Sequence, residues 1–354
     1  TGFTVGDAGT AVAVATGIGS QTLSITGSAI ANSANVAGVS SLNTSGLTLV
    51  DGTGLASNYT LPSSTGNVVI TPKAITVSIV DQTKVYDTTT VATGSLGMAG
   101  LFAGDSVAVN YSSAAFASPN VNVLTSPQTV TFSGVTLSGA SASNYTIGSG
   151  AITATASITP APVTISGLVA NNKVYTSTTV DVITGTPIVT GLLGSDTSTA
   201  TGTAVGTFAS PNVANSIAVA ADLSGMTLSN ANYVITGLTA PLAANITPAP
   251  LTISAGLTAA NKVYDTTTAA TIAVTGTQTL AGILGSDAAN LAVSSSGPYT
   301  GAFAQAGAAN GLVVAPSTST TVINGLSYST MDGVTLSGSA AGNYYVTGPT
   351  TALT

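Results

Sequence analysis

Three lysines recur at a fixed interval and are the residues of this chain best placed to do chemistry. Lys84, Lys173 and Lys262 each open the tripeptide Lys-Val-Tyr, and both gaps are 89 residues (173 − 84 and 262 − 173). A lysine amine can form an internal isopeptide bond with an asparagine side chain, and each lysine is followed by an Asn-Tyr pair. The candidate asparagines are Asn144, Asn232 and Asn343. Such a bond usually needs a buried carboxylate, which Asp would have to supply. The alternative is a lysine whose stem packs along a sheet while its amine reaches water.

Three aspartates recur in the same way and suggest a second chemistry. Asp105, Asp196 and Asp287 follow a Gly or Ser at intervals of 91 residues (196 − 105 and 287 − 196). Calcium bound between repeats would stiffen an array, but calcium prefers six to eight oxygen ligands with several carboxylates. One Asp per repeat also fits a residue that caps a turn. Calcium is therefore the only cofactor for which the sequence offers candidates, and these three are the candidate ligands.

The composition argues against most enzyme chemistry. The chain of 354 residues has no Cys, His or Trp, its four basic residues are all Lys, and its acidic residues are all Asp. Without His or Cys there is no Ser-His or Cys-His nucleophile pair, and the usual zinc ligands are missing. We expect no catalytic residues and no enzyme activity.

The charge and hydropathy patterns exclude two further classes of partner. A net charge of −7 with four cations is unsuited to neutralising nucleic-acid phosphates. No apolar run approaches the roughly 18 residues needed to span a bilayer. We expect no nucleic acid and no membrane span. The expected partners are the neighbouring repeats, and beyond them copies of the chain itself or a surface glycan.

The elements that carry these residues form a repeat of about 88 residues. A second marker, Ile-Thr-Pro, begins at Ile70, Ile158 and Ile246 with both gaps 88, and a fixed period of this size indicates an array of small domains. The third full repeat carries an insertion near 304–332, which we expect to form a longer hairpin or loop. We predict four repeats: repeat 1 at 1–72 without its first strands, repeat 2 at 73–160, repeat 3 at 161–248, and repeat 4 at 249–354 with a truncated end.

Within a repeat, short alternating segments predict β-strands. Residues 75–80 and 106–111 alternate apolar and polar side chains, as expected for half-buried strands. Six or seven such segments per repeat, separated by Gly, Asn and Ser, favour an all-β fold of tandem Ig-like β-sandwiches. A β-grasp-like unit is the alternative, with 94–104 supplying its helix.

The repeat resembles the YDG-type repeat of bacterial surface proteins and large secreted adhesins, which is related to the MBG-type repeats. The resemblance rests on Lys-Val-Tyr-Asp-Thr-Thr at 84–89 and 262–267, together with the Gly-Val-Thr-Leu-Ser-Gly, Asn-Tyr and Ile-Thr-Pro segments. The glycine of the name motif is Thr88 and Thr266 here, and the middle copy reads Tyr175-Thr176. The resemblance implies an extracellular or bacterial cell-surface setting and a role as stalk or spacer.

Three functions follow as expectations. The first is a stiff, non-enzymatic spacer of a bacterial surface or secreted adhesin. The second is a self-assembling extracellular filament, sheath or matrix component, because low charge leaves little repulsion between copies. The third is a carbohydrate-binding module that uses the 304–332 insertion as its loop.

Overall fold

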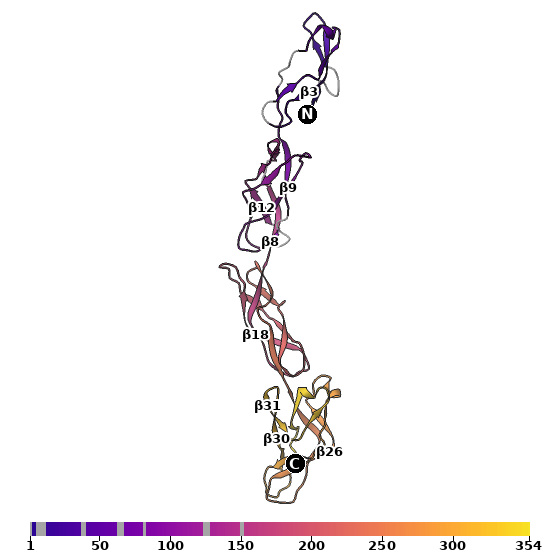
Figure 1. Ribbon diagram of the computed structural model, residues 1–354. Helices are drawn as coiled ribbons and strands as arrows, with labels where there is room; N and C mark the ends of the chain where they lie inside the picture. The colour runs from indigo at the N-terminus through magenta and orange to yellow at the C-terminus, as the bar shows by residue number, and fades with distance from the viewer. Residues whose placement is uncertain are drawn as a thin grey trace. The chain divides into compact units, whose positions relative to one another are not determined.

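The chain is all-β, with strands in several separate sheets (Figure 1). The computed structural model describes residues 2–4, 12–36, 40–61, 67–80, 83–122, 128–148 and 152–354. Helical structure in these residues is confined to 3-10 turns of three or four residues. The chain divides into two compact units, Thr1–Pro160 and Ala161–Thr354.

The first unit begins with a sheet built around one long strand. β3 pairs with β1, β2, β4 and β5, and β4 pairs in turn with β6. Asp51 accepts a hydrogen bond from the backbone of Ala56, at the 3-10 turn η2 (Ala56–Asn58), over 2.6 Å. The strands are β1 (Gly2–Thr4), β2 (Val12–Ala15), β3 (Thr22–Ala31), β4 (Ser40–Asn43), β5 (Leu47–Asp51) and β6 (Asn67–Val68).

The rest of the first unit forms three small sheets. Their orders are β11-β12-β15-β8, β14-β7-β9 and β10-β13. The 3-10 turn η3 (Ala142–Asn144) directly precedes β14. The strands are β7 (Lys73–Val80), β8 (Thr83–Val85), β9 (Ser95–Ala99), β10 (Ala108–Asn110), β11 (Ser113–Phe116), β12 (Gln128–Ser133), β13 (Thr136–Ser138), β14 (Tyr145–Ile147) and β15 (Ile152–Thr159).

In the second unit, residues 161–248 form a seven-stranded sheet with the order β17-β24-β21-β20-β18-β16-β23 and a two-stranded sheet β19-β22. Along the path from β24 to β16 every pairing is antiparallel, so the first and last strands of this repeat run in the same direction. The strands are β16 (Ala161–Ala170), β17 (Lys173–Val174), β18 (Val180–Thr190), β19 (Ala200–Gly202), β20 (Val205–Phe208), β21 (Ala214–Asp222), β22 (Met226–Leu228), β23 (Tyr233–Leu238) and β24 (Leu242–Thr247).

Residues 249–354 repeat part of this plan. A five-stranded sheet has the order β29-β28-β26-β25-β33, and β27-β32 and β30-β31 are separate pairs. The 3-10 turns are η4 (Asp287–Asn290) and η5 (Ala341–Asn343). The strands are β25 (Ala249–Ala259), β26 (Ala269–Ala281), β27 (Ala292–Val293), β28 (Tyr299–Phe303), β29 (Val314–Pro316), β30 (Thr318–Ile323), β31 (Leu326–Met331), β32 (Leu336–Ser337) and β33 (Tyr344–Pro349).

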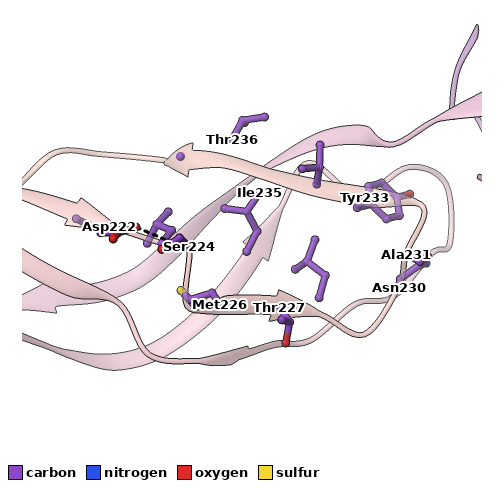
Figure 2. A pocket seen from close by; sticks show the side chains of 14 residues that line it. Asp222, Ser224, Met226, Thr227, Asn230, Ala231, Tyr233, Ile235 and Thr236 are labelled. Carbon is purple, nitrogen blue, oxygen red and sulfur yellow. Dashed lines mark hydrogen bonds between the residues drawn. The ribbon is translucent and has the colours of Figure 1, made fainter. Parts of the chain in front are cut away.

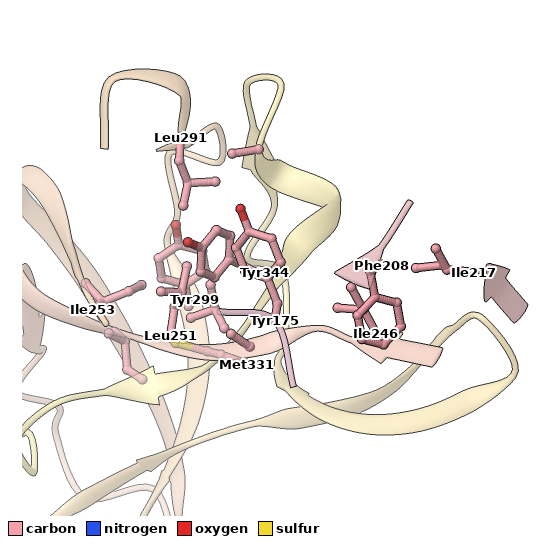
Figure 3. Close-up of a cluster of buried hydrophobic side chains, with 14 of the residues drawn as sticks. Tyr175, Phe208, Ile217, Ile246, Leu251, Ile253, Leu291, Tyr299, Met331 and Tyr344 are labelled. Carbon is pink, nitrogen blue, oxygen red and sulfur yellow. The ribbon is translucent and has the colours of Figure 1, made fainter. Parts of the chain in front are cut away.

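One buried cluster runs through both repeats of the second unit. Phe208 and Ile246 of repeat 3 belong to the same cluster as Leu251 of repeat 4 (Figure 3). Ile272 and Val314 of repeat 4 also belong to it, and all five are at most 1% exposed. Only Pro248 separates β24 from β25, so the last strand of one repeat runs almost directly into the first strand of the next. The two repeats are therefore joined by shared packing as well as by the chain.

The all-β prediction is confirmed. The β-grasp-like alternative, which needed a helix over residues 94–104, is wrong for that segment. Residues 94–104 contain strand β9, because the Leu and Met side chains there alternate with small residues that fit a pleated surface. The insertion, for which a longer hairpin or loop is expected, contains the hairpin β30–β31. Its two-residue turn is Asn324-Gly325, and both residues have positive φ (52° and 81°), the geometry that matches the twist of a hairpin.

Candidate functional site

Each recurring lysine closes a turn that follows its own tripeptide. Lys84 Nζ donates hydrogen bonds to Asp87 Oδ1 (2.7 Å), to the Thr89 carbonyl (2.7 Å) and to the Val91 carbonyl (3.0 Å). The hydrogen bond from Lys84 lowers the pKa of Asp87. The lysine amine thus holds together the segment that follows β8.

The same turn occurs in the other two copies. Lys173 Nζ donates to the carbonyls of Thr178 (2.6 Å) and Val180 (2.8 Å), and burial lowers the pKa of Lys173. Lys262 Nζ donates to Asp265 Oδ1 (2.7 Å), and this bond above all lowers the pKa of Asp265 to about 2. The lysine is a local structural cation in all three copies.

The turn has left-handed backbone at the position that is glycine in the motif the repeat resembles. Thr88, Ser177 and Thr266 have φ of 70°, 60° and 67°. Glycine adopts this region at no steric cost, whereas a side chain with a Cβ is strained there and a β-branched one especially so. The turn conformation therefore persists without its glycine, held by the lysine's hydrogen bonds.

The recurring aspartates each accept a hydrogen bond from the tyrosine of the Asn-Tyr pair in the same repeat. Tyr233 donates to Asp196 over 2.7 Å and Tyr344 donates to Asp287 over 2.8 Å, and Tyr145 and Asp105 form the same contact. Each hydroxyl also accepts a backbone N–H over 3.0 Å, from Phe102, Leu193 or Leu284. The two sequence markers therefore form one structural unit, in which a buried tyrosine bonds a half-buried aspartate.

In the second unit a tyrosine of repeat 3 also contacts the Asp-Tyr pair of repeat 4. Tyr175, the tyrosine of the second Lys-Val-Tyr, donates to Asp287 over 2.8 Å, and its ring meets that of Tyr344 edge-on at 5.3 Å (Figure 3). Burial first and the bond to Asp287 second raise the pKa of Tyr175 to about 12. Burial is also the largest cause that raises the pKa of Tyr344 to about 12. One carboxylate thus links tyrosines of two repeats.

The asparagine of the Asn-Tyr pair makes a second contact of this kind. Asn343 accepts the backbone N–H of Val213 (2.9 Å) and donates to the side chain of Asn212 (3.1 Å). The first unit contains the same arrangement, in which Asn144 accepts from Val36 (2.7 Å) and donates to Asn35 (2.9 Å). An Asn-Val dipeptide of one repeat docks on the Asn of the next.

Comparison with known families decides the membership of the chain. The model of the YDG domain matches residues 71–155, 159–240 and 247–352, which together make up more than half of the chain. This chain belongs to the YDG domain family. The three matched segments begin at 71, 159 and 247, each two residues before the predicted start of a repeat at 73, 161 or 249. No curated protein and no solved structure matches the chain.

In these YDG repeats the lysines and asparagines considered for isopeptide bonds contact other groups. The lysine amines contact turn oxygens, while Asn144 and Asn343 contact the preceding repeat. Among the described residues no three acidic side chains gather at one place that could hold a metal ion. The isopeptide bonds and calcium sites stay predictions. Intact mass, lower by one ammonia per bond, and melting with and without chelator test them.

The insertion of repeat 4 contacts the neighbouring repeat. The Asn324 carbonyl at the hairpin tip accepts a hydrogen bond from Asn215 of repeat 3 over 2.8 Å. Tyr328 of the hairpin packs on Tyr345 of β33 with ring centroids 4.8 Å apart. The insertion therefore adds a third contact to the joint.

A hollow of about 530 Å³ lies on repeat 3 between β22 and β23 (Figure 2). Its one ring, Tyr233, is 4% exposed, so it offers no open face for a sugar to stack on. Asp222 at its edge accepts the backbone N–H of Ser224 over 2.9 Å.

Among the described residues, no helix is long and apolar enough to cross a membrane.

The sequence reasoning missed the role of the Asn-Val dipeptides and of Tyr175 at the joint. Asn35-Val36 and Asn212-Val213 carry a usable signal, because the dipeptide recurs at the same place in the repeat. No local signal distinguishes Tyr175 from any other core tyrosine, since its partner Asp287 lies 112 residues away.

Proposed function

We propose that the chain is a non-enzymatic spacer, a stiff multi-repeat stalk segment of a bacterial cell-surface or secreted adhesin. The joint between repeats 3 and 4 is the observation that carries this proposal. Tyr175, Asp287 and Tyr344 are all committed to that joint, and a buried cluster continues through it. Two buried tyrosines and the carboxylate that they share therefore hold the two repeats together.

The strand directions within repeat 3 support the same role. β16 and β24, its first and last strands, run in the same direction, so the chain enters at one end of the sheet and leaves at the other. Pro248 follows β24 directly, which fixes φ and removes a backbone donor at the connection. A module built in this way passes the chain onward instead of returning it to its starting point.

The extracellular and bacterial setting is part of the proposal and is supported by the family and the composition. Charged residues make up only 4% of the chain. Four lysines without arginine leave tryptic proteases few cleavage sites, which suits an exposed position.

Small-angle scattering of the full chain over a concentration series tests the proposal. We expect a concentration-independent profile of a thin, extended particle. Substitution Tyr175→Ala should broaden the distribution of maximum dimensions, because it removes the ring and the hydroxyl from the joint. A compact particle, or a profile that Tyr175→Ala leaves unchanged, would contradict a stiff stalk.

A second candidate, a self-assembling filament, sheath or matrix component, is favoured by the hairpin of repeat 4. Within the described part of the chain β30 pairs with β31 alone, and 318–331 contain no charged residue. An uncharged, exposed strand edge is a template for pairing between chains, which proteins commonly block with lysine. Forward scattering that grows with concentration, and that Thr320→Lys suppresses, would identify this second function.

A further inference from the structure

β23 is the last strand of the seven-stranded sheet of repeat 3, and one of its edges is open. Within the described residues β23 pairs with β16 alone. The Asn232 carbonyl accepts the Ala161 N–H over 2.9 Å, so it faces β16. Since the main-chain groups of successive strand residues point to opposite edges, those of Val234 also face β16, whereas those of Ile235 face away. The N–H and C=O of Ile235 therefore point to the open edge.

The hollow between β22 and β23 lies along this edge. Met226, Leu228 and Ile235 are among the residues that line it, and Ile235 is directed from β23 toward β22 (Figure 2). Residues 226–238, which span both strands, contain no charged residue. The open edge thus offers main-chain groups for pairing beside an apolar surface, and no charge protects it in the way that proteins commonly protect an edge strand.

Repeat 4 covers the strand that corresponds to β23. β33 pairs in parallel with β25 just as β23 pairs with β16, so Tyr345 takes the place of Val234. The insertion hairpin packs beside β33, with the ring of Tyr328 on Tyr345 and with Met331, at the end of β31, only 1% exposed. In repeat 3 only residues 223–225 connect β21 to β22, and Val234 is 44% exposed. The strand that the hairpin covers in repeat 4 is therefore uncovered in repeat 3.

The hairpin has an open edge of its own, on β30. Ile323 and Leu326 close its two-residue turn and exchange hydrogen bonds, so the main-chain groups of Thr320 and Val322 face away from β31. The side chains of residues 318–322 are all exposed. β30 and β23 have the same length, six residues each, and neither contains a charged residue. The second unit thus carries two open, uncharged strand edges of matching length on two different repeats.

We propose that the open edge of β23 in repeat 3 accepts strand β30 of a second copy of this chain. The sheet of repeat 3 then continues into the hairpin of the other copy, and the added strand covers the hollow beside Ile235. Main-chain hydrogen bonds give such strand addition its affinity, and the side chains beside the edge give it selectivity. A second copy fits this edge because it brings a strand of the same length and no charge that would oppose close approach. The proposal rests on the self-assembling function described above and names its acceptor.

Donor and acceptor lie on different surfaces, and this sets the kind of assembly. Each copy gives β30 to one neighbour and receives β30 of another at β23, so the contact is heterologous and continues as a filament or closes as a ring. Pairing of β30 with β30 would instead be isologous and would stop at two copies. The two arrangements therefore differ in which surfaces a blocking substitution must touch.

Lysine substitutions at the two edges test the proposal in sedimentation experiments on the full chain over a concentration series. The unchanged chain should assemble as its concentration rises, whereas Thr320→Lys, which blocks the donor, and Val234→Lys, which blocks the acceptor, should each sediment as single copies. The matched control is Val182→Lys, which places the same charge at an exposed position (69%) of β18, a strand paired on both sides. This control should assemble like the unchanged chain, and the melting temperatures of the three variants show that each one folds.

Mixing the two blocked variants identifies the pairing. The Val234→Lys copy keeps its donor and the Thr320→Lys copy keeps its acceptor, so an equimolar mixture should form complexes of two copies and grow no further. Assembly that Thr320→Lys stops and Val234→Lys leaves intact would place the acceptor elsewhere and overturn this inference, while the self-assembling function would stand. A mixture that stays as single copies, or a control that is blocked as strongly as Val234→Lys, would also overturn the inference alone. Absence of assembly in the unchanged chain at every concentration would overturn both.

Discussion

Repeats 3 and 4 carry the same Lys-Val-Tyr tripeptide in two different environments. In repeat 3 the tripeptide is paired with β24, and Tyr175 is inserted against Asp287 and Tyr344 of the next repeat. In repeat 4 the lysine turn is the same, yet Tyr264 is mostly exposed. The comparison shows that the turn forms from local interactions, whereas the burial of its tyrosine depends on a neighbouring strand and a neighbouring repeat.

The largest difference is expected from removing the two tyrosine rings separately. Tyr175→Ala should lower the free energy of unfolding of the second unit by about 3–5 kcal/mol, the usual cost of deleting a buried aromatic ring. Tyr264→Ala should stay within about 0.5 kcal/mol, as is typical for an exposed position. Chemical denaturation of the full chain measures both. Equal losses would mean that Tyr264 is buried in solution.

Alkaline pH should weaken the joint between repeats 3 and 4. The folded-state pKa of Tyr175 and of Tyr344 is about 12, against an ordinary value of 10.0. Below pH 10 both folded and unfolded chains keep these protons, so the contribution is complete. Between pH 10 and 12 only the folded chain keeps them, and stability should fall by at most about 1.4 kcal/mol per pH unit for each tyrosine.

Melting as a function of pH measures this loss. In the double variant Tyr175→Phe and Tyr344→Phe the decline between pH 10 and 12 should be much shallower, since neither ring can ionise. An unchanged decline would assign the alkaline sensitivity to other groups.

Removing the shared carboxylate should have an intermediate effect. Asp287→Ala leaves two tyrosine hydroxyls at the joint without their acceptor, and an unsatisfied buried donor costs about 1–3 kcal/mol. Asp332→Ala, at an exposed position of the same repeat, is the matched control and should change little. A loss no greater than that of the control would show that the hydroxyls find other acceptors or water.

The smallest effect is expected from placing glycine at the left-handed position of the lysine turn, and it should be the same in repeats 3 and 4. Ser177→Gly and Thr266→Gly relieve a left-handed backbone of similar φ (60° and 67°), and each should raise the free energy of unfolding by about 0.5–1 kcal/mol. Thr267→Gly should instead lower it, because the Thr267 hydroxyl bonds both Asp265 and Lys262. Unequal gains at 177 and 266 would show that the two turns differ as well as their surroundings.

The sequence predicted the fold better than it predicted the site. The period of Lys-Val-Tyr and Ile-Thr-Pro locates the repeats, and alternating segments such as 75–80 do form strands. The hairpin of the insertion follows from the Thr-rich segment that forms β30 and from its Asn-Gly turn. These features are local, so they can be read from a few neighbouring residues.

The contacts of the marked residues could not be read in the same way. Asp287 and Tyr344 recur once per repeat, which indicates that each matters but not that they touch, because 57 residues separate them. The contact of Tyr175 with Asp287 depends on how one repeat packs on the next, and no pattern within a repeat encodes that. The lysines are crosslink candidates because they recur at a fixed interval together with the Asn-Tyr pairs, and this recurrence does not reveal that their amines bond the oxygens of the turn that follows.

The parallel course of β16 and β24 has a consequence for how repeat 3 responds to force. A pull on the two ends of the repeat acts along these strands in opposite directions, because the chain enters at the start of one and leaves at the end of the other. β16 would have to slide along β23 and β18, and β24 along β17 and β21, so the hydrogen bonds of each ladder are loaded together in shear. Strands peeled from one end would lose those bonds singly, at a much lower force.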